Sequence, residues 1–235
     1  MAKGNKTISL IDFYNTEAPE ASEFRRLLHN LNAVLSAENR HTILITSAMG
    51  SEGKSIISSF LAMTAARQKD KKTLLIDFDL RRPTIHRLFS MNRDNGLSDI
   101  LSDGKSVRSV IRTTSMEKLD ILTAGRAISN PSDLIDALAI RKIIEEMKFY
   151  YELIIIDSSP MIPVSDPLLI LEEVDGVVIV VKAGATPRGV IRRAVDLLAP
   201  QRKKVLGVVV NNLTHSLPYY YNYNYYGYQY KPTKQ

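Results

Sequence analysis

The segment from Ser47 to Ser55 constrains this chain most, because it combines glycines, a lysine and a serine in a pattern that binds phosphate. It follows the apolar run 42–46 and precedes an amphipathic segment that extends to about residue 68, so we expect a strand, a loop and a helix. Glycine-rich loops of this kind direct backbone N–H groups and a helix N-terminus at a phosphate. The segment therefore predicts a nucleotide triphosphate site.

Each residue of this loop has an expected role. Lys54 would reach the terminal phosphates and Ser55 would ligate Mg²⁺. The expected ATP-binding residues are Met49, Gly50, Ser51, Glu52, Gly53, Lys54 and Ser55. Ala48 stands where the strict pattern G-x-x-x-x-G-K-[ST] has its first glycine, so the match is to a relaxed form. An ordinary polar turn is the alternative, and the strand and helix on either side favour the phosphate loop.

Two further apolar runs end in aspartate. Residues 73–76 precede Asp77 and Asp79, and residues 153–156 precede Asp157. Short apolar runs between turn signals indicate buried parallel strands, and ligands of open α/β sheets bind beyond the carboxyl ends of such strands. We therefore expect the three aspartates to meet the phosphate loop.

Carboxylates in this position are typical ligands of Mg²⁺, so Asp77, Asp79 and Asp157 are expected to hold the ion together with Ser55. For the first two, the alternative is that they only solvate a strand end and pair with Arg81 or Arg82.

The alternation of apolar runs with helical segments predicts an α/β fold with a doubly wound, mainly parallel sheet. Further strands are expected at residues 119–122, 176–182 and 204–210, and further helices at 19–37, 130–149 and 187–199. We expect one domain over residues 1–217, followed by a separate tail over residues 218–235.

Composition excludes several classes of protein. The chain has no cysteine, which excludes disulfides and thiolate metal sites, and its four histidines show no ligand spacing. It has no apolar run of the roughly 18 residues needed to cross a bilayer and no signal segment, so a cytoplasmic location is expected. The formal charge of +6 comes from basic residues that occur singly or in short pairs, so no specific nucleic-acid partner is expected.

The C-terminal tail holds eight of the eleven tyrosines of the chain. Between residues 218 and 230 it has no aliphatic residue and no period, so it cannot form a core and is expected to be a flexible, low-complexity segment. An inert aromatic tail is the alternative.

Taken together, these segments resemble the bacterial tyrosine kinases (BY-kinases), of the type in which the cytoplasmic kinase is a separate polypeptide from its membrane adaptor. This family is built on the P-loop NTPase fold of the Min/Par branch. The resemblance covers roughly residues 19–212 and the tail. The segments that carry it are 47–55, 74–83, 154–160, Gly96 to Asp99, and Asn130-Pro131.

The resemblance implies ATP-dependent autophosphorylation of the tail, with ATP and Mg²⁺ as cofactors. The implied phosphoacceptors are Tyr219, Tyr220, Tyr221, Tyr223, Tyr225, Tyr226, Tyr228 and Tyr230. The implied catalytic residues are Lys54, Asp77, Asp79 and Asp157. Either Asp77 or Asp79 would be the base, with the other on Mg²⁺, and the sequence leaves the choice open. Asn211 would contact adenine.

Partners also follow from the resemblance. It implies a transmembrane adaptor that activates the kinase and holds it at the inner face of the membrane, an opposing protein-tyrosine phosphatase, and a role in capsule or exopolysaccharide synthesis and export. It further implies a ring-like homo-oligomer, built through an E-x-x-R-x-x-R motif that appears here as Glu23, Arg26 and His29. The last arginine of that motif is replaced.

Two other functions are compatible with a phosphate loop. A partitioning-type ATPase would need a second lysine at the position of Met49, and usually a terminal amphipathic helix, and the sequence has neither. A non-catalytic nucleotide-binding adaptor would use the site only to hold its shape.

Overall fold

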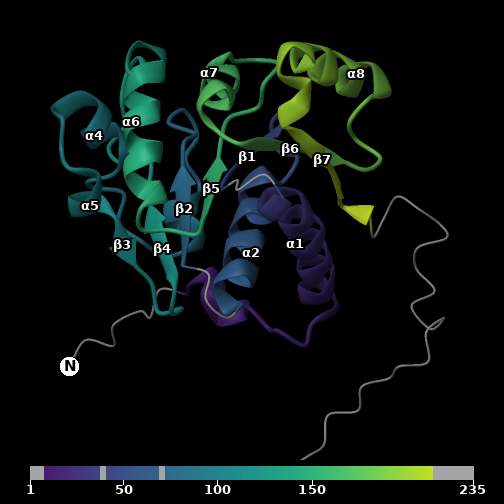
Figure 1. Cartoon of the computed structure of the whole chain (residues 1–235), viewed down its shortest axis with the longest axis horizontal. Helices are drawn as coiled ribbons and strands as arrows, with labels where there is room; N and C mark the ends of the chain where they lie inside the picture. The colour runs from purple at the N-terminus through teal and green to yellow at the C-terminus, as the bar shows by residue number, and fades with distance from the viewer. Residues whose placement is uncertain (1–7, 38–40, 69–71, 214–235) are drawn as a thin grey trace, which may run out of the picture.

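We analysed a computed structural model of the chain, which describes residues 8–37, 41–68 and 72–213 (Figure 1). Seven strands form one sheet in the order β3-β4-β2-β5-β1-β6-β7, and every neighbouring pair is parallel except β3 and β4. The strands are β1 (Thr42–Ser47), β2 (Thr73–Asp77), β3 (Arg112–Thr113), β4 (Leu119–Leu122), β5 (Leu153–Asp157), β6 (Gly176–Lys182) and β7 (Val205–Asn211).

Helices cover both faces of this sheet (Figure 1). One face carries the 3₁₀ helix η1 (Leu10–Phe13), α1 (Pro19–Ala37), α2 (Lys54–Arg67) and α3 (Ile85–Leu88). The opposite face carries α4 (Leu97–Asp103), α5 (Val107–Val110), η2 (Pro131–Asp133), α6 (Ala137–Lys148), α7 (Asp166–Glu173), α8 (Arg188–Leu197) and η3 (Ala199–Lys204). The expected doubly wound, mainly parallel α/β sheet is confirmed.

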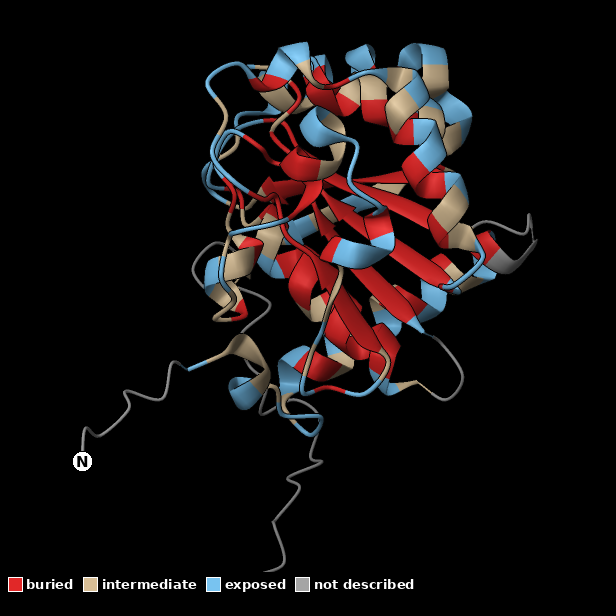
Figure 2. Cartoon of the chain, turned by 90° about the vertical axis from the view of Figure 1, so that its left-hand side faces the viewer, coloured by how far each residue is buried: buried red, intermediate tan, exposed pale blue. Residues whose placement is uncertain are grey.

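The central strands are buried on both faces, and this burial explains their sequences. In β1, Ile43 and Ile45 pack toward α1 and α2, whereas Leu44 packs with the core on the opposite face. Figure 2 shows the buried strands between helices whose outer faces are exposed. A strand covered on both sides has no polar face, so it reads as a continuous apolar run rather than an alternating one.

The region after residue 130 departs from the sequence expectation. A single helix over 130–149 is expected, but the chain forms the short η2 and then α6, with Asp136 as the N-cap residue. The Asp136 side chain accepts the N–H of Ala139 at 3.0 Å. An aspartate satisfies the free N–H groups of a first turn better than it fits a helix interior, so it starts a new helix here. The helix α7 was not expected at all.

Some expectations concern the ends of the chain. The tyrosine-rich tail at residues 218–235 lies outside the described residues, and the division of the chain at residue 217 stays a prediction. Among the helices that the structure describes, none has the length and apolarity needed to cross a bilayer.

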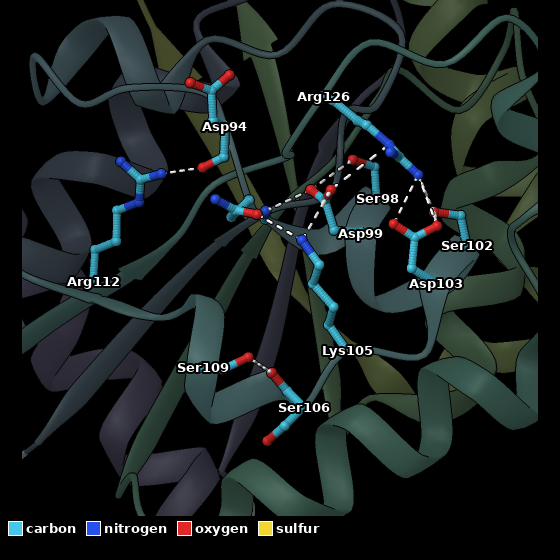
Figure 3. A network of polar contacts seen from close by, with 12 residues as sticks. Asp94, Ser98, Asp99, Ser102, Asp103, Lys105, Ser106, Ser109, Arg112 and Arg126 are labelled. Atoms are coloured by element: carbon cyan, nitrogen blue, oxygen red, sulfur yellow. Dashed lines mark hydrogen bonds and ion pairs between the residues drawn. The ribbon is translucent and has the colours of Figure 1, made fainter.

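A polar network fixes the start of α4 against the loop after β4 (Figure 3). The buried Asp99 accepts the N–H of Gly96 at 2.8 Å and forms ion pairs with Lys105 at 3.7 Å and Arg126 at 3.6 Å. Burial alone would raise the pKa of Asp99, but the Gly96 hydrogen bond and the two cations lower it below its usual value. The N–H of Leu97 also donates to the Thr123 carbonyl at 2.8 Å.

The close backbone approach at Gly96 gives a stability prediction. A Cβ at this position would lie 2.3 Å from the Thr123 carbonyl oxygen, and backbone atoms cannot easily move away. We expect Gly96→Ala to lower the free energy of unfolding by about 1 to 3 kcal/mol in urea titration. Gly189→Ala is the control, because a Cβ there meets open space and α8 gains helix propensity. Equal stability of the two variants would contradict the prediction.

Candidate active site

The phosphate loop connects β1 to α2 and adopts a left-handed backbone at two positions. Ser51 has φ 63° and Gly53, the N-cap residue of α2, has φ 92°. Ala48 is fully buried in the core and has no positive φ. The first position of the motif therefore needs no glycine in this chain, which explains why the relaxed form of the pattern still gives the loop.

An open cavity of about 590 Å³ lies beside this loop. Its lining residues are Gly50, Ser51, Gly53, Lys54, Ser55, Ile56, Asp79, Arg81, Arg82, Thr84, Arg87, Ser159, Pro160, Pro163 and Val164. Five of the seven predicted loop residues thus line the same cavity as Asp79. Met49, Glu52 and Asn211 are not among the lining residues.

Asp77 and Asp157 are register partners at the ends of the adjacent strands β2 and β5, and neither is exposed to solvent. The Asp77 carboxylate accepts backbone N–H groups from Asp79 at 3.2 Å and from Thr84 and Ile85 at 3.0 Å each. Burial, followed by the negative charge of Asp157, raises the pKa of Asp77 well above its usual value, although the two backbone bonds from the start of α3 lower it. Asp77 is thus bound to the loop that follows it.

The two carboxylate oxygens of Asp157 differ in their hydrogen bonding. Its Oδ1 accepts the Ser58 hydroxyl at 3.1 Å, whereas its buried Oδ2 has no hydrogen-bond partner among the described residues. Burial raises the pKa of Asp157 to about 6, against the opposing effects of Lys54 and of the hydroxyls of Ser55 and Ser58.

Two oxygen donors near the start of α2 fit Mg²⁺, although Asp157, like Asp77, is not a lining residue of the cavity. The ion prefers oxygen ligands, keeps several waters, and is usually bound through one or two carboxylates together with substrate phosphates. The free Oδ2 of Asp157 and the hydroxyl of Ser55 match that requirement. Within the described ranges no three His, Cys, Asp or Glu side chains form a metal-binding group, so a full protein cage is not built here.

The two arginines after Asp79 have different partners. The Arg81 guanidinium forms an ion pair with the buried Asp166 at 3.0 Å and also bonds to Ser132, so it pairs with neither Asp77 nor Asp79. Asp79 accepts the backbone N–H of Arg82 at 2.9 Å. Sequence reasoning missed Asp166, although Asp166 followed by Pro167 is a recognisable helix start.

The expected oligomer contacts lie away from the cavity, on the exposed face of α1. Glu23 and Arg26 form an ion pair at 3.0 Å, and His29 is exposed. Their contact with another subunit stays a prediction.

Comparison with known proteins defines the class of this chain. The family model described as ParA, NUBPL iron-transfer P-loop NTPase matches residues 38–226, so the chain belongs to the ParA-like P-loop NTPases.

Similarity to named proteins shows which family within this class the chain belongs to. The chain is 36% identical over 227 residues to the Staphylococcus aureus protein named tyrosine-protein kinase CapB, covering 95% of this chain and 99% of that one. It is 31% identical over 207 residues to tyrosine-protein kinase YwqD of Bacillus subtilis, covering 88% and 86%. The solved kinase domain of Escherichia coli tyrosine kinase ETK matches with a TM-score of 0.81 at 28% identity, covering 92% and 86%. The chain is a member of the bacterial tyrosine kinases of the capsular type.

The buried charge of Asp157 gives a prediction for the protein without nucleotide. An aspartate whose pKa is raised in the folded state is destabilising above that pKa, and the cost disappears as the pH falls below the unfolded value. We expect Asp157→Asn to raise the free energy of unfolding at pH 7.5 by about 1 to 3 kcal/mol, with a gain that shrinks from pH 6 toward pH 4. Chemical denaturation at several pH values measures this.

The matched control is Asp196→Asn, which changes an exposed aspartate of α8 and should leave stability unchanged. The same Asp157→Asn protein should bind nucleotide more weakly in Mg²⁺. A gain that is constant between pH 4 and pH 7.5 would show that the effect does not come from the buried charge.

Proposed function

We propose that this protein is an ATP-dependent tyrosine autokinase that transfers the γ-phosphoryl group of ATP to its C-terminal tyrosine cluster. One observation carries the proposal: the phosphate loop, with Lys54 and Ser55, shares a cavity with the carboxylate of Asp79. Phosphoryl transfer needs a cradle for the phosphates and a group that accepts the proton of the attacking hydroxyl, and these residues supply both.

The residues of the loop would stabilise the transferred group. Lys54 and the loop N–H groups that face the cavity would neutralise charge on the phosphoryl oxygens as the bond to the leaving ADP breaks. Ser55 and Asp157 would hold Mg²⁺, which supplies further charge neutralisation when it is bound. Arg82, which also lines the cavity, would add positive charge near the acceptor side.

Asp79 is the carboxylate that we assign as the base. It lines the cavity, whereas both oxygens of Asp77 accept backbone N–H groups and Asp77 is not a lining residue. A phenol with a pKa near 10 is ionised in about one molecule per thousand at pH 7, a deficit of about 4 kcal/mol. A positioned base contributes roughly 10²- to 10⁴-fold, which offsets much of this deficit. The tyrosine oxygen attacks phosphorus, and its proton passes to Asp79.

The biological setting that we propose is the one implied by the resemblance to the family. The proposed substrates are the eight tail tyrosines, reached between subunits of a ring-like homo-oligomer that uses Glu23, Arg26 and His29. A transmembrane adaptor would place the protein at the inner face of the membrane, and a protein-tyrosine phosphatase would reverse the reaction. The proposed role is control of capsule or exopolysaccharide synthesis and export, in line with the capsular kinases that this chain resembles.

The test is incorporation of labelled phosphate from ATP into purified protein, alone and with the cytoplasmic segment of an adaptor. Wild type should label its tyrosines. Lys54→Met should abolish labelling, since it removes the charge at the terminal phosphates, and the variant with phenylalanine at all eight tail positions should lose most of it. Phenylalanine keeps the aromatic bulk and removes only the acceptor hydroxyl.

Each alternative function gives a different result. ATP hydrolysis without tyrosine labelling would favour a partitioning-type ATPase. Nucleotide binding with neither reaction would favour a non-catalytic adaptor. Undiminished labelling of the phenylalanine variant would show that the tail is not the substrate.

The assignment of the base gives a further prediction. Asp79→Asn should lower kcat for tyrosine labelling about 10²- to 10⁴-fold, while the affinity for ATP, measured by calorimetry, changes little. Asp77→Asn is the informative comparison, because Asp77 does not line the cavity. It should lower kcat less than Asp79→Asn does. Full activity of Asp79→Asn would exclude Asp79 as the base.

A further inference from the structure

The side chain of Glu52 lies within the phosphate loop but does not line the cavity. It is 3% exposed. Its Oε2 accepts the N–H of Met49 at 2.7 Å, and its Oε1 accepts the hydroxyl of Thr186. A buried carboxylate is costly unless its oxygens are hydrogen-bonded, and these two contacts supply the partners. The first consequence concerns Met49, whose N–H is bound to Glu52 rather than available to a phosphate.

Thr186 connects this carboxylate to the sheet. It lies between β6 and α8, and its Oγ1 accepts the N–H of Lys182, the last residue of β6, at 3.0 Å. A hydroxyl has one proton to donate and two lone pairs to accept, so it can donate to Glu52 while it accepts from Lys182. Thr186, which is 134 positions from Glu52 in sequence, thus joins the phosphate loop to the end of β6.

Asn211 holds the same loop from the neighbouring strand. It is the last residue of β7 and the register partner of Lys182. Its Nδ2 donates to the Glu52 carbonyl at 2.9 Å, and a Cβ on Gly53 would lie 2.1 Å from that nitrogen. The amide group therefore packs against the loop at Gly53. This contact gives Asn211 a role that does not require contact with adenine.

We infer that Glu52, Thr186 and Asn211 form a tether that holds the phosphate loop in its nucleotide-binding conformation, with Thr186 and Asn211 as positioning residues. None of the three lines the cavity. Glu52 and Asn211 bond to backbone atoms of the loop, and Thr186 acts through the carboxylate of Glu52. A loop that is in the competent conformation only part of the time binds with an apparent Kd raised by the inverse of that fraction. The inference rests on the nucleotide site of the proposed function and assigns to Thr186 a role in it.

The experiment measures the Kd of the full chain for a non-hydrolysable ATP analogue with Mg²⁺, by calorimetry. Thr186→Val keeps the shape of the side chain and removes the hydroxyl, so Oε1 of Glu52 and the Lys182 N–H both lose this partner. We expect about tenfold weaker binding or more. Thr186→Ser restores the hydroxyl and should bind within about threefold of wild type.

Thr114→Val is the matched control, because Thr114 is also half-buried and its hydroxyl also accepts one backbone N–H, that of Met116, while donating to nearby carbonyls. It lies between β3 and β4 and does not line the cavity, so Thr114→Val should change thermal stability without changing the Kd. Binding by Thr186→Val within twofold of wild type, or an equal loss in Thr114→Val, would overturn the inference.

Binding is measured here without phosphoryl transfer. A wild-type protein that binds the analogue but labels no tyrosine would therefore overturn the proposed function and leave the tether intact. Weak binding by both Thr186→Val and Thr186→Ser would show that the hydroxyl is not the feature that matters, and would overturn the assignment of Thr186.

Discussion

Two carboxylates with no exposure to water, Asp77 and Asp157, lie side by side at the ends of adjacent parallel strands. Ionised groups in such a place cost several kcal/mol each unless hydrogen bonds and opposite charges compensate them. The loop after β2 supplies backbone N–H groups to Asp77, and the first turns of α2 supply Lys54 and serine hydroxyls to Asp157. The loop after β2 and the first turns of α2 are therefore held in place by their contacts with these two side chains.

This arrangement separates residues that face the cavity from residues that hold them in place. Asp79, Lys54 and Ser55 line the cavity. Asp77 does not line it and accepts backbone N–H groups, and Glu52 does not line it and accepts the N–H of Met49 and the hydroxyl of Thr186. In an open α/β sheet the loops at the carboxyl ends of the strands are free to vary, but the residues beneath them are packed against strand ends. The buried carboxylates of Asp77 and Glu52 therefore contact the loops that border the cavity without lining it.

Three residues of this chain differ from the motifs of related proteins, and the structure shows what surrounds each of them. Ala48 packs in the core and needs no glycine backbone. Met49 presents a side chain that is 46% exposed while its N–H is held by Glu52. His29 lies on the exposed face of α1 near the Glu23–Arg26 pair. None of these three residues lines the cavity that Asp79 and Lys54 share.

The sequence by itself predicted the phosphate loop, the alternation of strands and helices around it, and the sheet edge at which Asp77, Asp79 and Asp157 follow buried strands. These features are local: apolar runs report burial, and the end of a parallel strand fixes where its last side chain lies. The tertiary structure alone decided which aspartate faces the cavity, because the direction of Asp79 depends on the path of the loop beyond β2. It also decided the long-range partners, since Arg81 meets Asp166 across 85 positions and Glu52 meets Asn211 across 159. The periodicity of apolar residues does not predict such contacts, because they form only when the ends of separate strands are brought to one edge of the sheet.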